Sequence, residues 1–276
     1  MASVADMPNQ QEKADLFRSI HQPGRPLRMA NAWDQGSAKL FASLGFQALA
    51  TTSGGHAATL GRLDGTASRE ESLAHAASVV EATHLPVSAD LENCFADSPE
   101  GVVTTIVGAV AAGLAGCSVE DSTGNADAPI YDRGLAAERV AAAAEAAHGP
   151  IRLVLTARAE NFLHHRPDLA DTIARLQAFQ QAGADVLYAP GLTQLEDIRQ
   201  VVSALDRPVN VLALPGVPSV DELAAVGVAR VSVGSAFAYV ALGAGASAAR
   251  EFLHEGTTHY FATATQGRAD LRAALS

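Results

Sequence analysis

The sequence predicts an α/β fold, a (β/α)8 TIM barrel in which eight parallel strands close into a ring with helices outside. Eight short apolar runs alternate with helical segments along the 276 residues. Gly45, Gly113 and Gly183 each precede an apolar run and lie 68 and then 70 residues apart. This spacing gives about 35 residues per strand–helix unit, so eight units fill the chain. We therefore expect a single barrel domain over residues 1–276, with an open doubly wound sheet as the alternative.

The elements can be assigned in order. Residues 1–26 are expected to be an N-terminal arm with a helix over 10–20, followed by a strand over 27–30 and a helix over 34–44. Each of the next apolar runs begins at or near a proline or a glycine that follows a last helical turn. We place the corresponding strands at 45–51, 85–89, 113–119, 149–155, 183–188, 207–212 and 227–233. Helices are expected at 69–83, 136–147, 169–181 and 195–205. Residues 244–276 predict extra C-terminal helices that pack on a partner subunit.

Composition excludes several classes of function. The net charge of −11 and an aromatic content of only 5% disfavour nucleic acid as a partner, because a phosphate backbone would be repelled. The N-terminus lacks the basic start and apolar run of a signal peptide, and no stretch of about 18 apolar residues indicates a membrane segment. Two cysteines without a CxxC pair favour a reducing compartment. We expect a soluble cytoplasmic protein that binds neither nucleic acid nor membrane.

Two predicted strands end in pairs of carboxylates. The short strand Val87–Ala89 is followed by Asp90 and Glu92, which point the same way because they are two residues apart in an extended segment. Cys117-Ser-Val is followed by Glu120 and Asp121. Such a cluster repels itself unless a cation lies within it, so it predicts a hard divalent cation held by oxygen ligands. Solvated loop acids are the alternative.

Other groups follow strand ends, where the chemistry of such barrels lies. Ser53, Gly54 and Gly55 offer a hydroxyl and open backbone amides for a carboxylate or phosphonate group, with a plain turn as the alternative. Arg158 ends an apolar strand and is expected to project into the mouth towards a substrate carboxylate or enolate oxygen, with an internal salt bridge as the alternative. Asn210 is either a satisfied core amide or a substrate ligand.

The remaining polar candidates predict structural roles. His56, His164 and His165 form no metal-binding or triad-like grouping and are interpreted as surface residues. Cys94 and Cys117 are interpreted as small buried packing groups. The dipeptide Glu138-Arg139 is interpreted as part of a solvated helix face.

Seven segments together resemble the isocitrate lyase/phosphoenolpyruvate mutase superfamily over residues 27–255. They are NAWDQGSAKL (31–40), LGFQALATTSGG (44–55), PVSADLE (86–92), VED (119–121), TAR (156–158), AGAD (182–185) and PVNVL (208–212). The resemblance implies a Mg²⁺-dependent barrel, with Mn²⁺ as a substitute, that makes or breaks C–C or P–C bonds next to a 2-oxo acid through an enolate-like intermediate. It also implies a dimer or tetramer in which the last barrel helix swaps onto a neighbour.

The resemblance assigns roles residue by residue. It implies that Asp90 contacts Mg²⁺ and the substrate, with Glu92, Glu120 and Asp64 holding the ion mostly through water. It further implies that Ser53, Gly54 and Gly55 bind the substrate, and Asn210 is counted with them as a candidate substrate ligand. Arg158 would neutralise the substrate's charge, and Arg158 and Asp64 would be the catalytic residues.

The sequence also departs from the superfamily pattern. The loop 121–131 contains neither the Cys nor the Lys of the gating loop that the lyases carry after strand four. Pro190 stands where those lyases place a Glu after strand six, and Tyr239 lies near the position of a tricarboxylate-binding Arg. These differences predict a pocket for an oxo acid smaller than isocitrate.

Three hypotheses follow. The first is a Mg²⁺-dependent carbon–carbon lyase that acts on a small 2-oxo or 2-hydroxy dicarboxylate related to oxaloacetate or 2-oxoglutarate, with only weak isocitrate lyase activity. The second is a phosphonopyruvate-type P–C hydrolase or mutase. The third is a 2-oxo acid binding protein without turnover.

Overall fold

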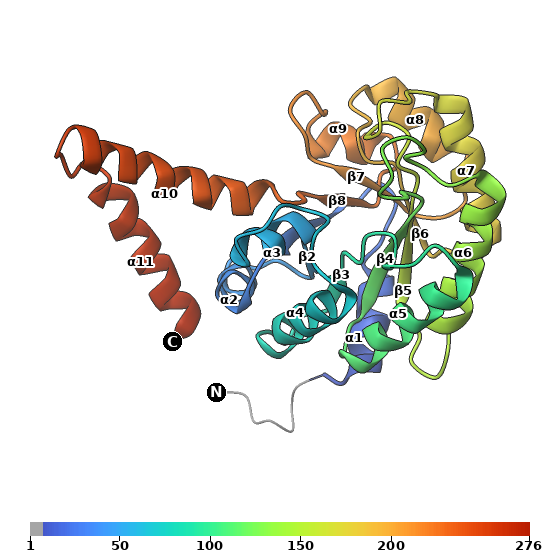
Figure 1. Cartoon of the computed structure of the whole chain (residues 1–276), viewed down its shortest axis with the longest axis horizontal. Coiled ribbons are helices and arrows are strands. Elements are labelled where there is room, and N and C mark those ends of the chain that lie inside the picture. The colour runs from blue at the N-terminus through green and yellow to red at the C-terminus, as the bar shows by residue number, and fades with distance from the viewer. Residues whose placement is uncertain (1–7) are drawn as a thin grey trace.

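The computed structural model describes residues 8–276, which form a closed barrel of eight parallel strands in sequential order (Figure 1). The first seven residues of the predicted N-terminal arm lie outside the described part. The strands are β1 (Leu27–Ala32), β2 (Leu49–Thr51), β3 (Val87–Ala89), β4 (Gly116–Glu120), β5 (Val154–Arg158), β6 (Val186–Tyr188), β7 (Val209–Leu212) and β8 (Arg230–Ser232). Leu27 pairs with Arg230 and Met29 with Ser232, so β1 and β8 close the ring. The TIM barrel is confirmed, and the alternative of an open sheet is wrong.

Helices follow the strands around the outside of the barrel, apart from α1, which precedes β1. They are α1 (Gln10–Ser19), α2 (Gln35–Ser43), α3 (Ser53–Thr59), α4 (Arg69–Glu81), α5 (Pro99–Ala111), α6 (Arg133–Ala147), α7 (Leu169–Gln181), α8 (Leu195–Ser203), α9 (Val220–Ala225), α10 (Ala236–His254) and α11 (Phe261–Leu275). Local sequence fixes their ends. Ser68 caps α4 in a capping box with Glu71, and Asp34 does the same for α2 with Ser37. Gly113 and Gly183 adopt positive φ of 80° and 109° just after helices, as their predicted role at helix ends requires.

The helix α1 fills the N-terminal end of the barrel. Phe17 is fully buried there, and it packs with Ala14, Leu27, Val154 and other small apolar residues in a cluster separate from the main core. A Cβ at Gly116 would lie 2.8 Å from Cε1 of Phe17 and 2.7 Å from the carbonyl oxygen of Val154. Only glycine therefore allows the ring of Phe17 to seal the barrel at this point.

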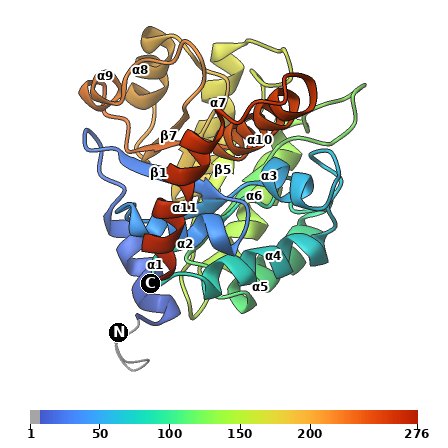
Figure 2. The same ribbon diagram turned by 90° about the vertical axis from the view of Figure 1, so that its left-hand side faces the viewer.

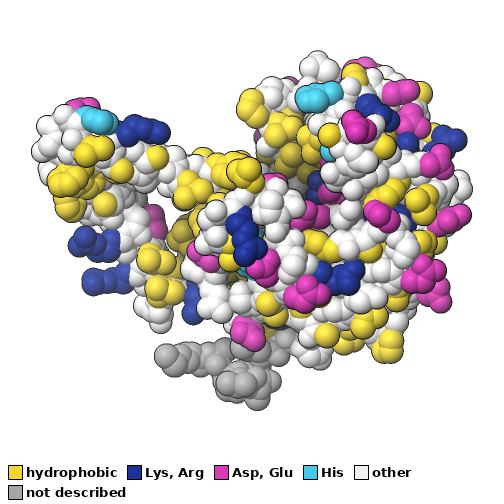
Figure 3. Space-filling model, in the orientation of Figure 1, with side chains coloured by type: hydrophobic (Ala, Val, Ile, Leu, Met, Phe, Trp, Pro, Cys, Tyr) yellow, Lys and Arg dark blue, Asp and Glu magenta, His cyan; other side chains and the backbone are white. Residues whose placement is uncertain are grey.

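The C-terminal helices form an arm beside the barrel (Figure 1). The helix α10 begins at Ala236 rather than at 244, because Gly243 and Gly245, although unfavourable in a helix, do not interrupt it. Ala238 is its only buried residue, and α11, which has none, returns to lie beside α2 (Figure 2). Figure 3 shows hydrophobic side chains along this arm, where Phe252 is 63% exposed and Leu253 75% exposed.

Within residues 8–276, no helix combines the length and the apolar character that a membrane-crossing segment requires.

Candidate functional site

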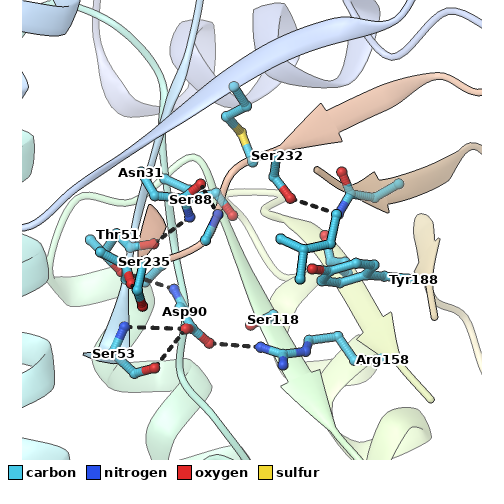
Figure 4. Close-up of a pocket in the computed structure, with 18 of the residues that line it drawn as sticks. Asn31, Thr51, Ser53, Ser88, Asp90, Ser118, Arg158, Tyr188, Ser232 and Ser235 are labelled. Atoms are coloured by element: carbon cyan, nitrogen blue, oxygen red, sulfur yellow. Dashed lines mark hydrogen bonds and ion pairs between the residues drawn. The ribbon is translucent and has the colours of Figure 1, made fainter. Parts of the chain in front are cut away.

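A cavity of about 230 Å³ lies inside the barrel and opens at the carboxyl ends of the strands. Its lining residues come from all eight strands and the segments that follow them, and many are polar (Figure 4). Of the residues predicted to form the site, it is lined by Ser53, Asp64, Asp90, Arg158 and Asn210. A second, more open hollow shares Ser53, Asp64 and Arg158 and adds Glu92 and Glu120. The structure therefore brings these seven predicted residues to one end of the barrel.

Asp90 is held firmly in the cavity wall. Its Oδ2 accepts hydrogen bonds from the backbone nitrogen of Ser53 at 3.2 Å and from Ser53 Oγ at 3.0 Å. Its own backbone nitrogen donates to Thr51 Oγ1 at 2.9 Å, which ties β3 to the end of β2. The carboxylate is therefore oriented by two neighbouring strand ends before any ligand binds.

Arg158 projects into the mouth, as predicted, and also forms the internal ion pairs that were the alternative. Its Nη1 lies 3.0 Å from Asp90 Oδ1, its Nη2 3.0 Å from Glu120 Oε2, and its Nε 2.8 Å from Glu160 Oε1. The register explains this arrangement, because Glu120 pairs directly with Arg158 across β4 and β5. Glu160 lies two residues further along the same extended segment and faces the same side. The guanidinium lies among three carboxylates of the mouth.

Carboxyl groups outnumber arginines at this end of the barrel. Burial, and then repulsion from Asp90 and Asp64, raises the pKa of Glu92 to about 7. Burial raises the pKa of Glu120 well above its usual range, although the charge of Arg158 opposes that shift. Burial therefore favours the protonated form of these two carboxyl groups.

The donor set fits Mg²⁺ that keeps much of its water. Carboxylate oxygens are the ligands that Mg²⁺ prefers, and this ion is commonly held by one or two carboxylates plus water. In the described part of the chain, no three His, Cys, Asp or Glu side chains converge closely enough to enclose a metal ion directly. Asp90, Asp64, Glu92 and Glu120 are the carboxylates at this end of the barrel that could hold such an ion together with water.

The segment Ser53-Gly54-Gly55 is neither a loop nor a plain turn. It forms the first turn of α3, whose N-cap is Thr52. The amide of Ser53 donates to Asp90, and the amide of Gly55 donates to Thr52 Oγ1 at 3.4 Å. Neither glycine lines the two hollows, because both support close packing. A Cβ at Gly54 would lie 2.7 Å from Ser235 Oγ and 2.8 Å from Tyr239 Oη.

Two asparagines line the cavity, and they differ in how fully their side-chain amides are hydrogen-bonded. Asn210 is 2% exposed and donates from Nδ2 to Ser232 Oγ at 3.0 Å, but its Oδ1 has no partner among the described residues. It is thus a half-satisfied core amide that faces the cavity, which leaves its predicted role as a ligand open to test. Asn31, which sequence reasoning did not single out, joins three strands by donating to the carbonyl of Thr51 and accepting from the amides of Val233 and Gly234.

Asp121 does not join the acidic mouth. It directly follows β4, so its side chain points to the opposite side from Glu120. Its Oδ2 lies 3.0 Å from Arg175 Nη1, and its Oδ1 accepts from the backbone nitrogen of Glu160 at 2.8 Å. Asp121 is therefore a buried structural partner of Arg175.

Two structural interpretations from the sequence were wrong. Arg139 is 1% exposed rather than on a solvated face, and it donates to the carbonyl oxygens of Glu120 and Ala96, each at 2.9 Å. His56 is buried rather than on the surface, and its ring stacks on His75 with 3.9 Å between the centroids. Neither side chain carries a local sequence signal, because its burial is produced by distant elements.

The other two histidines and the cysteines largely agree with their predictions. His165 is exposed and His164 is half-buried. Cys94 and Cys117 are free and fully buried, which confirms the packing role.

The comparisons with known proteins agree with this geometry. A family model described as phosphoenolpyruvate phosphomutase matches residues 17–253. The chain belongs to the isocitrate lyase/phosphoenolpyruvate mutase superfamily. This superfamily match spans every residue of the predicted site.

Individual superfamily relatives differ in their names. A crystal structure from Burkholderia cenocepacia, described as a "putative lyase/mutase", shares 50% sequence identity, covers 95% of both chains and has a TM-score of 0.91. An uncharacterised protein of Mycobacterium tuberculosis is 32% identical over 236 residues, which is 85% of this chain and 87% of that protein. The 2-methylisocitrate lyase of Escherichia coli is 28% identical over 227 residues, which is 74% of this chain and 76% of the enzyme.

Proposed function

We propose that this superfamily member is a Mg²⁺-dependent lyase that cleaves a carbon–carbon bond of a small 2-oxo or 2-hydroxy dicarboxylate. The observation that carries the proposal is the mouth of the barrel, where Arg158 lies among Asp90, Glu120 and Glu160 with further carboxylates nearby. A fixed guanidinium beside an excess of oxygen ligands is suited to a substrate whose oxygen gains negative charge during reaction.

The chain's own residues have separable tasks in this proposal. Asp90 would hold Mg²⁺, while Ser53 and Thr51 keep its carboxylate and backbone in place. Bound Mg²⁺ would supply electrostatic stabilisation of an enolate oxygen. Arg158, whose guanidinium carbon lies 5.4 Å from the centre of the Tyr188 ring, would donate hydrogen bonds to the same oxygen or to the adjacent carboxylate.

A second candidate is cleavage or transfer at a P–C bond. The description of the matching family model as phosphoenolpyruvate phosphomutase favours it. A phosphonate group carries more negative charge than a carboxylate, so it would require the same Arg158 and the metal. The two candidates differ in product, because only P–C cleavage of phosphonopyruvate in water releases phosphate.

The deciding experiment assays purified protein with Mg²⁺ against oxaloacetate, 2-oxoglutarate, isocitrate and phosphonopyruvate, and measures oxo acid and phosphate products separately. We expect carbon–carbon cleavage of a dicarboxylate, loss of activity with EDTA and recovery with added Mg²⁺. Glu120→Gln should lower kcat by roughly 100-fold, whereas Glu145→Gln, an exposed acid on α6, should have no effect.

Each other outcome has a distinct meaning. Phosphate release from phosphonopyruvate, or its conversion into phosphoenolpyruvate, would select the second candidate. Tight binding of an oxo acid without turnover of any substrate would show a binding protein and overturn the enzyme proposal. Full activity in excess EDTA would overturn the requirement for Mg²⁺.

A further inference from the structure

The floor of the cavity carries a buried arginine without an acidic partner. Arg230, at the start of β8, is 3% exposed and lines the cavity together with Arg158. Its Nη2 donates to Thr156 Oγ1 at 3.1 Å, and its Nη1 lies 3.1 Å from His21 Nε2. Within residues 8–276, no carboxylate lies within 4.0 Å of its guanidinium, and its Nε has no hydrogen-bond partner. Arg158, by contrast, pairs with three carboxylates.

His21 does not relieve this imbalance. Its Nδ1 lies 2.6 Å from the carbonyl oxygen of Phe17, so Nδ1 carries the hydrogen and Nε2 accepts from Arg230. Burial, and then the charge of Arg230, lowers the pKa of His21 to about 3, which keeps the ring neutral. Burial lowers the pKa of Arg230 only to about 10, so the guanidinium remains charged at neutral pH. A buried charge with only neutral partners is costly and therefore calls for an explanation.

Other polar groups of the same cavity are also incompletely paired. Ser118 is 8% exposed and its Oγ has no hydrogen-bond partner among the described residues. Asn210 Oδ1 is in the same condition, and both residues line the cavity with Arg230. Small inward side chains such as Ala50 and Ser88 leave the space open, where larger residues would fill a barrel interior. The cavity thus has a positive floor, a free hydroxyl and room for a small molecule.

We propose that Arg230 and Ser118 form an anion site at the floor of the cavity that binds a carboxylate group. The occupant during turnover is the second carboxylate of the substrate, an assignment that rests on the function proposed above. Thr156, the partner of Arg230, precedes Arg158 by two residues on β5. The positions of Arg230 and Arg158 along the direction of this strand therefore differ by roughly 7 Å. A dicarboxylate of four or five carbons spans such a distance with one end at each arginine. A free small carboxylate is the other source of the same chemistry.

The first experiment tests the floor site without any substrate. The melting temperature is measured in sodium formate against sodium MES at equal ionic strength, because the MES anion carries a sulfonate on a bulky ring instead of a small planar carboxylate. We expect formate to raise the melting temperature of the wild type and of Arg28→Met, which removes an exposed arginine of β1. Arg230→Met and Ser118→Val should each lose the shift. An equal effect of formate and MES on the wild type would overturn the site, and so would a full shift in a folded Arg230→Met or Ser118→Val protein.

The second experiment asks whether the substrate supplies the anion. Calorimetry with Mg²⁺ compares 2-oxoglutarate with 2-oxovalerate, which has the same chain length but only one carboxylate. We expect the wild type to bind 2-oxoglutarate roughly 100-fold more tightly, in line with a charged hydrogen bond. Arg230→Met should lose that preference while its affinity for 2-oxovalerate is unchanged; if Arg230→Met does not fold, Ser118→Val takes its place.

The two proposals fail in different ways. An undiminished preference in the variant would show that the second carboxylate binds elsewhere, so that free anions alone occupy the floor. If neither oxo acid binds the wild type, the proposed function fails, and the formate experiment still decides whether the floor site exists.

Discussion

Arg139 Nη1 donates to the carbonyl oxygen of Glu120 at 2.9 Å, which links α6 to the last residue of β4. The same guanidinium donates to the carbonyl oxygens of Asn93 and Ala96, in the loop after β3. Glu92, Cys94 and Phe95 in this loop have positive φ of 50°, 59° and 54°, which non-glycine residues rarely adopt. One buried side chain therefore holds in place a strained loop beside the acidic mouth.

Arg139→Met should destabilise the protein. Three carbonyl oxygens would lose a charged donor, and we expect the free energy of unfolding to fall by about 3 kcal/mol. Urea unfolding measures the change. Glu138→Gln, the exposed neighbour on α6, is the control and should unfold like the wild type. A small effect of Arg139→Met would mean that the loop keeps its conformation without the guanidinium.

Arg158→Met should increase the response of the protein to Mg²⁺. The substitution leaves Asp90, Glu120 and Glu160 without their counter-charge, so a divalent cation gains more by binding among them. We expect a lower melting temperature without metal, a larger rise on adding Mg²⁺, and a loss of activity of roughly 100-fold or more. The measurement compares the melting temperatures of the variant and the wild type in calcium-free buffer, with and without added Mg²⁺. A Mg²⁺ shift smaller than that of the wild type would contradict the prediction.

Alanine at Gly54 and at Gly245 should have opposite effects. A Cβ at Gly54 would lie within 3 Å of Ser235 Oγ and Tyr239 Oη, whereas nothing lies within 4 Å of one at Gly245. We expect Gly54→Ala to destabilise by about 1–3 kcal/mol through overpacking. Gly245→Ala, in the middle of α10, should stabilise by up to about 1 kcal/mol. Thermal or chemical unfolding of the two variants measures these changes in stability. Equal changes in the free energy of unfolding would refute the packing argument.

Stability should fall on mild acidification because of His75. Burial, and then the charge of the stacked His56, lowers the pKa of His75 from 6.5 to about 4. The unfolded chain therefore binds a proton more readily than the folded protein, so stability is full above pH 6.5 and declines as the pH falls towards 4. The contribution is about 3 kcal/mol at most.

His75→Gln can still donate to the carbonyl oxygen of Trp33. In this variant the stability should decrease less steeply as the pH is lowered. Melting temperatures between pH 4 and 8 test this, with the exposed His84→Gln as control. Some pH dependence should remain in His75→Gln, because His21 has an even lower pKa of about 3. An unchanged slope would exclude His75 as a source of acid sensitivity.

We propose that copies of the chain associate through α10, in line with the dimer or tetramer that the resemblance implies. Leu242, Phe252 and Leu253 are more than half exposed along this helix. Light scattering after size exclusion should give a dimer or tetramer, and Phe252→Asp combined with Leu253→Asp should yield monomers. A monomeric wild type would contradict the proposal.

Local sequence predicted the barrel well because each strand–helix unit carries its own signals. The range Val87–Ala89 was predicted to the residue, and Gly113 and Gly183 end helices as expected. Contacts between distant segments were harder to predict. Glu120 and Asp121 are neighbours at the end of β4 and so point to opposite sides, yet only the pairing of β4 with β5 and the position of Arg175 determine which of them faces the mouth.

Sequence reasoning located most of the mouth but not the floor of the cavity. Arg158 was recognised because it ends an apolar strand, and Glu160 could have been recognised as the same-side residue two positions on. Arg230 lies inside an apolar run, where a single charge gives no indication of which side it faces. Its burial depends on His21 and Thr156, which approach from opposite parts of the chain.

The seal that Phe17 forms at the lower end of the barrel has a kinetic consequence. Under the proposed function, two fragments formed in a cavity that opens only at the carboxyl ends of the strands would have to leave one after the other. The fragment nearer to Asp90 would leave first, and the one retained by Arg230 would leave last. Product inhibition should accordingly be competitive for the deep fragment and noncompetitive for the shallow one.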